Sequence, residues 1–342
     1  MSNSLPISKY TGCLLGAAIG DALATPFTGL SVAEIEATGR AGDFQPAREA
    51  QAFVIPLGEL RELAEPGFAE SLAAGQWTED VQLMLALADV LIEENGAFIP
   101  EAWAHSLVRW LNDAPRSPGI STVQTAIQLR TGGVMWDEAA DPEGAGCGAA
   151  ARVAPLALLF PNRTELRVST ALTQAQTTHE HPDAQAAALA MAEAIALLLP
   201  LDASTRAQWD GSAFLTELIT RVEARDPRFA EFARCLALAR ILLDDKVELA
   251  TAVRVLGISG WSREAVPCAL FCIAHSPHDF ESLLRHVVAL TAGSTEAIAC
   301  MAGTLAGALH GLDAIPISWR VGVEAGQKIL GIARTLHALA PV

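Results

Sequence analysis

Apolar residues recur every three or four positions along most of this 342-residue chain. One helical face of the segment 81–92 shows the pattern: Leu83, Met84, Leu87, Val90 and Leu91. Comparable patterns predict further helices over residues 100–111, 121–129, 150–159, 184–199, 214–222, 229–243, 247–255, 266–274, 280–290, 296–310 and 322–338. Strand-like alternation of apolar and polar residues is scarce, and the chain has a single tyrosine. The pattern predicts an all-α protein.

Turn-forming residues separate these helices. Gly, Pro and Asp gather in the segments 38–49, 112–119, 132–148 and 202–211, where we expect loops. None of these segments looks like a long polar linker between domains. We therefore expect one domain that spans residues 1–342, although this length is large for a single domain.

Two segments carry glycines at a spacing of four: Gly12, Gly16 and Gly20, and later Gly303, Gly307 and Gly311. A glycine inside a helix costs about 1 kcal/mol relative to alanine, so the repetition indicates that another backbone approaches each stripe closely. The two stripes pack against each other, or each packs against a third element. We expect both helices to be central, the first ending at Asp21 and the second beginning at Ser294 and Glu296.

Charge and composition exclude several classes of protein. Lys and Arg number 23 and Asp and Glu 39, a net charge of −16 without a basic run, so binding to nucleic acid or to an anionic membrane surface is not expected. The most apolar segment, 184–201, is interrupted by Glu193 and predicts a buried core helix. The first ten residues lack the pattern of a signal peptide, which predicts a cytoplasmic protein. The six cysteines form no CxxC pair, so we expect reduced, buried thiols.

Two acidic helix starts carry the candidate chemistry. Thr78, Glu79 and Asp80 directly precede one apolar helical run, and Glu296 begins another. Carboxylates at a helix N-terminus either cap it and complement its dipole or line a site. Mg²⁺ requires near-octahedral oxygen coordination that one triplet cannot complete, so a metal site would need Glu296 and Asp21 as well.

Two further segments lie before helices. His179 and His181 flank Glu180, where they could bind a metal, or where one could cap or hydrogen-bond while the other is solvated. The glycine-rich stretch 144–148 opens the helix that carries Arg152, and such a loop can cradle phosphate. Arg152 is then a phosphate partner or part of a structural ion pair.

These motifs occur in an order that resembles a known family. Residues 12–23 look like its opening glycine-spaced helix, and residues 75–80 are similar to its G-x-W-T-D-D signature. Residues 146–155 are similar to its G-N-G-A-A-M-R-x-x-P segment. Thr178 and His179 match a T-H pair before a long alanine-rich helix, and residues 292–299 stand where it has G-G-D-x-D-T-I-A. Nearly the whole chain thus resembles the ADP-ribosylglycohydrolase family, which includes the dinitrogenase-reductase-activating glycohydrolases and the crystallin J1 relatives.

The resemblance implies a compact all-α bundle and a pair of Mg²⁺ ions between the two acidic segments. The ions would grip the ribose hydroxyls of an ADP-ribosyl group and activate water against its anomeric carbon. It implies these metal ligands: Thr78, Glu79, Asp80 and Glu296, of which the three carboxylates would be catalytic. It places these residues at the substrate: Asp21, Thr28, Gly146, Cys147, Gly148, Arg152, His179, Gly293 and Ser294.

The sequence departs from the family pattern at the metal site. Glu79 and Glu296 are lengthened relative to Asp, and Ser294 and Ala297 replace an Asp and a Thr ligand. Thr28 stands where a glutamate is expected, and Cys147 where an asparagine is. Because Mg²⁺ tolerates little geometric error, we expect a weakened site that holds one ion or none.

Three functions are therefore compatible with the sequence. The first is a hydrolase of an ADP-ribosylated protein or of a small ADP-ribosyl or nucleotide ligand. The second is a crystallin-like or regulatory member that binds ADP-ribose or another nucleotide without turnover. The third is a helical interaction protein without a ligand pocket, which would need an exposed apolar patch.

Overall fold

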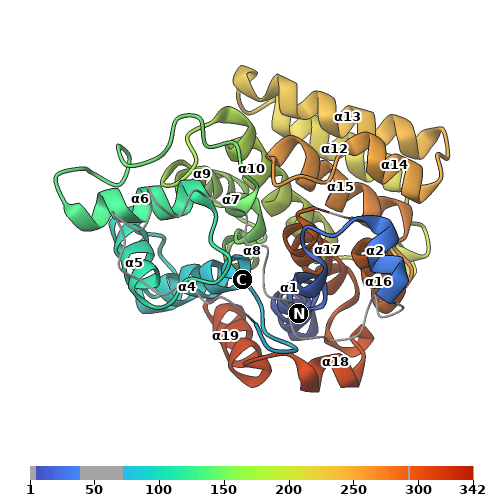
Figure 1. The fold of residues 1–342 in the computed structure, drawn as a ribbon, viewed down its shortest axis with the longest axis horizontal. Coiled ribbons are helices and arrows are strands. Elements are labelled where there is room, and N and C mark those ends of the chain that lie inside the picture. Colours follow the sequence, from blue (N-terminus) through green and yellow to red (C-terminus); the bar gives the residue numbers. More distant parts are fainter. Residues whose placement is uncertain (1–4, 39–71, 292, 342) are drawn as a thin grey trace.

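The computed structural model describes residues 5–38, 72–291 and 293–341, and within these ranges the chain is helical without a β-strand (Figure 1). The prediction of an all-α protein is confirmed. The elements are α1 (Ile7–Ala24), η1 (Thr25–Phe27), α2 (Val32–Thr38), α4 (Glu79–Glu93), α5 (Pro100–Asn112), α6 (Ile120–Thr131), α7 (Gly148–Ala151), α8 (Ala154–Leu159), α9 (Thr164–Gln176), α10 (Pro182–Leu198), α11 (Ala203–Arg206), α12 (Gly211–Glu223), η2 (Pro227–Phe229), α13 (Ala230–Asp244), α14 (Leu249–Leu256), α15 (Ser262–His275), α16 (Phe280–Leu290), α17 (Thr295–His310), η3 (Leu312–Ala314), α18 (Ile317–Gly322) and α19 (Gly326–Leu339).

The segments 150–159 and 322–338 are not continuous helices as predicted. α7 ends at Ala151 and α8 begins at Ala154, because Pro155 lacks an N–H and its ring would clash with the carbonyl of Ala151 in an unbroken helix. Near the C-terminus, α18 ends at Gly322 and α19 begins only at Gly326.

Other boundaries also differ from the prediction. The first helix, α1, runs past Asp21 to Ala24. The segment 202–211 contains α11, a single turn that Asp202 caps. The helices α2 and α9 were not predicted, and most of the predicted loop 38–49 lies outside the described residues.

The helices α1 and α17 lie against each other in the interior of the molecule (Figure 1). A Cβ on Gly12 would lie 2.6 Å from the carbonyl carbon of Gly311, and one on Gly307 would overlap the carbonyl oxygen of Gly12. Further along, Gly16 faces Gly303 in the same way. The two glycine stripes therefore pack against each other, as the first alternative predicted.

Gly307→Ala tests this contact. We expect it to lower the free energy of unfolding by about 1 to 3 kcal/mol, because the added methyl forces two backbones apart. Gly331→Ala in α19 is the matched control, since no atom lies within 4 Å of a Cβ at that position. It should raise stability by up to about 1 kcal/mol through helix propensity. Urea denaturation of both variants measures the difference, and equal midpoints would contradict the packing argument.

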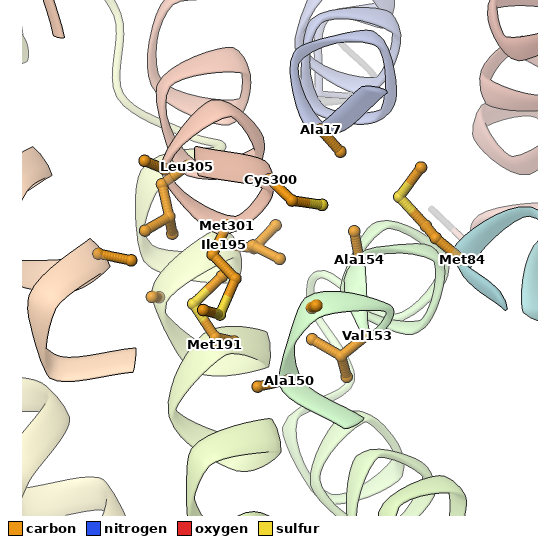
Figure 2. Close-up of a cluster of buried hydrophobic side chains, with 14 of the residues drawn as sticks. Ala17, Met84, Ala150, Val153, Ala154, Met191, Ile195, Cys300, Met301 and Leu305 are labelled. Atoms are coloured by element: carbon orange, nitrogen blue, oxygen red, sulfur yellow. The ribbon is translucent and has the colours of Figure 1, made fainter. Parts of the chain in front are cut away.

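The hydrophobic core joins the helices that bear the candidate site residues. Figure 2 shows side chains from α1, α4, α7, α8, α10 and α17 that meet in one cluster. Ala17, Met84 and Met301 are wholly buried there. A single cluster of buried residues extends from Tyr10 in α1 to Leu336 in α19. Such packing supplies a rigid base for a site at the ends of these helices, and one domain over 1–342 stays our prediction.

The apolar helix α10 is buried as predicted, and it carries an internal charge network. Oε1 of Glu193 lies 2.8 Å from Nε of Arg167, and Oε2 pairs with Nη1 of Arg221. The Glu193 and Arg167 side chains are almost wholly buried, whereas that of Arg221 is one-third exposed.

Among the described residues, no single helix has both the length and the composition of a membrane span. One pair of helices, Ile7–Phe27 and Val32–Thr38, meets both criteria together, but it is bent by 97°.

All six cysteines are free thiols, and five of them are buried. Cys268 and Cys272 lie one turn apart inside α15, in the core. The expectation of reduced, buried cysteines is confirmed except at Cys235, which is partly exposed.

Candidate functional site

The first acidic segment is fixed to the end of α1. Thr78 is the N-cap of α4, and its backbone N–H and hydroxyl donate to the carboxylate of Asp21 at 3.0 Å and 2.9 Å. The hydroxyl of Thr25 donates to Oδ1 of Asp21 at 3.0 Å. Both oxygens of Asp21 are therefore engaged, and this buried carboxylate holds α4 in register with α1.

Glu79 and Asp80 form the buried first turn of α4. The backbone N–H of Gly119 donates to Oε1 of Glu79 at 2.5 Å, and the N–H of Glu79 donates to the carbonyl of Arg116 at 2.8 Å. Oε2 of Glu79 is buried without a hydrogen-bond partner in the described structure. A buried carboxylate oxygen is costly to leave unpaired, so this atom is available to a ligand.

The second acidic segment reaches the same place. Glu296 lies in the first turn of α17, and the hydroxyl of Thr28 donates to its Oε2. Thr28 belongs to the segment that follows α1, so it anchors Glu296 to that segment. The backbone N–H of Gly29 donates to the carbonyl of Gly293 at 3.0 Å, and Gly293 has a φ of 106°, which favours glycine.

Burial raises the pKa of each carboxyl group in this cluster, and repulsion from neighbouring carboxylates adds to the rise at Asp21, Glu79 and Asp80. Burial raises the pKa of Asp21 to about 7, opposed by the hydrogen bonds from Thr78, and the charge of Glu296 adds to the rise. Burial raises the pKa of Glu79 to about 7 and that of Asp80 well above its ordinary value, and neighbouring carboxylates add to both. Burial also raises the pKa of Glu296, against the hydrogen bond from Thr28. Segments more than two hundred residues apart therefore share one acidic site.

The glycine-rich loop lies beside the acidic cluster. The N–H of Cys147 donates to the carbonyl of Gly260 at 2.9 Å, and the hydroxyl of Ser262 donates to the carbonyl of Gly146 at 2.8 Å. The Cys147 thiol is buried, and burial together with the charges of Asp80 and Glu296 raises its pKa well above the ordinary value. It is therefore a neutral thiol rather than a reactive thiolate.

The sequence analysis missed the segment 258–262, which joins the two halves of the site. The N–H of Ser294 donates to the carbonyl of Ile258 at 3.0 Å, while Gly260 holds the glycine-rich loop. Glycines at 257 and 260 before a helix were the available signal. Trp261, which is 59% exposed, lines a cavity of about 180 Å³ with Glu143, Ala145, His181, Asp183 and Arg263.

Arg152 has no exposed surface. Its Nε donates to Oε1 of Gln174 at 2.9 Å, its Nη2 donates to Oγ1 of Thr178 at 2.5 Å, and its guanidinium lies 5.2 Å from the ring centroid of Trp103. These contacts fix the side chain in the core, while its Nη1 is buried without a hydrogen-bond partner among the described residues. Its role as a phosphate partner stays a prediction. Its charge lowers the pKa values of Glu79 and Asp80, against their burial.

The two histidines have different environments. His181 caps α10, since its side chain accepts from the N–H of Asp183 at 3.2 Å. His179 is 4% exposed, and its Nδ1 lies 2.7 Å from Oγ1 of Thr178. Burial and the charge of Arg152 lower the pKa of His179 to about 3, so its ring is neutral at physiological pH. It faces Gly146 and Gly148, because Cβ atoms on these glycines would lie 3.4 Å and 3.7 Å from its ring.

Within the described residues, the acidic cluster is not arranged as a preformed metal site. In the ranges 5–38, 72–291 and 293–341, no three His, Cys, Asp or Glu side chains are grouped so as to hold a metal ion. The oxygen donors predicted for Mg²⁺ do share the site, and their roles as ligands remain a prediction.

Fold and site together define a helical protein with a buried acidic site between the starts of α4 and α17, two helices that lie far apart in the sequence. The family model described as ADP-ribosylglycohydrolase matches residues 2–342. The chain therefore belongs to the ADP-ribosylglycohydrolase family, as the motifs predicted.

Individual relatives cover almost the whole chain. A protein of Archaeoglobus fulgidus that carries the name "Uncharacterized protein" is 34% identical over 333 residues, 97% of this chain and 96% of its own length. ADP-ribosylhydrolase ARH3 of Danio rerio is 26% identical and covers 97% of this chain and 91% of itself. ADP-ribosylarginine hydrolase Tri1 of Pseudomonas putida is 26% identical, with 98% and 79% covered.

A solved structure has the same fold. It is titled "ADP-ribosylglycohydrolase-related protein complex" and superposes with a TM-score of 0.69 at 24% identity, covering 98% of this chain and 99% of its own.

Proposed function

We propose that this protein hydrolyses the glycosidic bond of an ADP-ribosyl adduct by directing water to the anomeric carbon. The observation that carries the proposal is that α4 and α17, from distant parts of the chain, contact each other and bring Asp80 and Glu296 into one buried acidic site. The names of the relatives support activity on ADP-ribosyl groups in general. The substrate we propose is an ADP-ribosylated protein or a small ADP-ribosyl ligand.

The acidic residues would have two roles, stabilisation of the transition state and positioning of α4. Cleavage at an anomeric carbon passes through a transition state with positive charge on the sugar, which buried carboxylates stabilise. Glu79, Asp80 and Glu296 are placed for this role, because Gly119 holds Glu79 and Thr28 holds Glu296. Asp21 would act by positioning Thr78 and the start of α4.

The donor chemistry fits Mg²⁺, although a three-residue cluster is not preformed among the described residues. The four proposed ligands, Thr78, Glu79, Asp80 and Glu296, all offer oxygen, the donor that Mg²⁺ prefers. The buried Oε2 of Glu79 has no hydrogen-bond partner in the described structure, which supports a role for this oxygen as a cation ligand. When bound, Mg²⁺ would supply polarisation of the ribose hydroxyls and activation of water. Weak binding of the metal agrees with the loss of ligands at Ser294 and Ala297.

A second function, binding of ADP-ribose or another nucleotide without turnover, is favoured by one observation. The carboxylates are not grouped as a metal cluster within the described residues; Ser294 lacks the carboxylate, and Ala297 the hydroxyl, of the family pattern. Such a protein would keep the nucleotide-facing loop 146–148 and His179 and lack the catalytic ion. A cytoplasmic location remains a prediction for either function.

Two measurements separate these functions. Calorimetry with ADP-ribose, with and without Mg²⁺, measures binding, and mass spectrometry measures release of ADP-ribose from peptides modified on arginine or serine. We expect metal-dependent binding together with release from one of the peptides. Binding without release would favour the second function, and the absence of both would reject the proposal.

A further inference from the structure

A chain of hydrogen bonds connects Arg152 to His179 through Thr178. Nη2 of Arg152 lies 2.5 Å from Oγ1 of Thr178, and the same oxygen lies 2.7 Å from Nδ1 of His179. Arg152 and Thr178 have no exposed surface. Water therefore does not replace either of these two bonds, and the hydroxyl hydrogen of Thr178 must find its acceptor within the protein.

The direction of these bonds follows from donor chemistry. A guanidinium has only donors, so Oγ1 of Thr178 accepts from Arg152. Within the described residues this hydroxyl has no partner besides Arg152 and His179. Its own hydrogen must then go to Nδ1 of His179, because the opposite direction would leave a buried hydroxyl hydrogen unpaired. Nδ1 accepts, so the proton of a neutral ring resides on Nε2.

The protonated nitrogen faces the glycine-rich loop. A Cβ on Gly146 would lie 3.4 Å from Nε2 of His179, and one on Gly148 would lie 3.9 Å from it. Glycine at both positions leaves this edge of the ring uncovered. Nε2 has no hydrogen-bond partner among the described residues, and it is not among the fully buried unpaired atoms. It is therefore an unpaired donor that faces the glycine-rich loop.

We propose that Arg152 and Thr178 are positioning residues that fix His179 as an Nε2–H donor to an anionic oxygen of the bound ADP-ribosyl group. The inference rests on the proposed function for the identity of the ligand. In this arrangement His179 donates a hydrogen bond and does not transfer a proton, and Arg152 orients His179 through Thr178. The acid and base chemistry then falls to the carboxyl cluster.

The tautomer is measurable without any ligand. Nitrogen chemical shifts of protein labelled with ¹⁵N-histidine distinguish protonated from unprotonated ring nitrogens, and His179→Gln assigns the His179 signals by their loss. We expect a proton on Nε2 and none on Nδ1 in the unaltered protein. In Thr178→Val we expect both tautomers, because the valine cannot donate to Nδ1. A proton on Nδ1 in the unaltered protein would overturn the inference.

Calorimetry with ADP-ribose and Mg²⁺ tests the effect on the ligand. Thr178→Val should weaken binding by about 10-fold, while Thr178→Ser, which restores the hydroxyl, should stay within about 3-fold of the unaltered protein. Circular dichroism checks that both variants are folded. Equal tautomers and equal affinities in all three proteins would overturn the inference. If the unaltered protein binds no ADP-ribose yet carries the proton on Nε2, the proposed function fails while the positioning of His179 stands.

Discussion

Asp80→Ala should abolish hydrolysis while the protein stays folded. We expect the rate of ADP-ribose release to fall by about 100-fold or more, the scale on which removal of one preorganised polar group acts in an active site. The carboxylate of Asp80 is buried and accepts no hydrogen bond within the described residues, so its loss breaks no hydrogen bond that holds the fold. Release assays and thermal unfolding of the same preparation measure the two effects.

The same variant has a pH signature. Burial and neighbouring carboxylates raise the pKa of Asp80 in the folded state, so between the unfolded and folded pKa values the folded protein binds more protons. The free energy of unfolding therefore decreases as the pH rises from the unfolded-state pKa of Asp80 to its folded-state pKa. Asp80→Ala removes this decrease. We expect the variant to gain more in Tm at pH 8 than at pH 4.

Glu93→Ala is the matched control for Asp80→Ala. It removes a carboxylate from the other end of α4, where Glu93 is 63% exposed in a pair with Arg109. Activity and Tm should stay close to those of the unaltered protein. Full activity in Asp80→Ala would exclude this carboxylate from the mechanism.

Glu193→Ala should be strongly destabilising. Glu193 pairs with Arg167 inside the protein, and its removal leaves a buried guanidinium without its carboxylate. Breaking such a pair costs about 3 to 5 kcal/mol, which is a large part of the stability of a typical domain. Urea denaturation of the variant measures the change in the free energy of unfolding.

Arg221→Ala is the comparison for Glu193→Ala. It removes the other partner of the same carboxylate, but Arg221 is one-third exposed, so we expect a loss of at most about 1 kcal/mol. Equal losses in the two variants would show that burial does not set the energy of this network.

Helical periodicity predicted most of the fold because packing in this protein depends on continuous apolar faces. The prediction was wrong where a single residue overrides the pattern, as Pro155 does between α7 and α8. It also missed α9, whose buried side includes polar residues such as Arg167 and Gln174. These residues are satisfied by partners on other helices, and such partners cannot be read from local spacing.

The candidate site was predictable where side chains carry the signal. Thr78, Glu79, Asp80 and Glu296 stand out in the sequence because a polar triplet or a lone acid interrupts an apolar run at a helix start. Gly119, Ile258 and Gly260 act through backbone N–H and carbonyl groups, which nearly every residue possesses. Their contribution depends on where the chain folds back, and the glycines at 257 and 260 mark a turn there without specifying its partners.

The pairing of α1 with α17 affects how the chain is made. At translation rates of about 5 to 20 residues per second, the 270 residues between Ala24 and Thr295 take roughly 15 to 55 s to synthesise. Throughout that interval the apolar surface of α1, nearly all of which is buried in the finished protein, lacks its partner. The nascent chain therefore exposes the apolar surface of α1 on the ribosome until the last helices emerge. We expect chaperones that bind apolar segments to shield it during this interval.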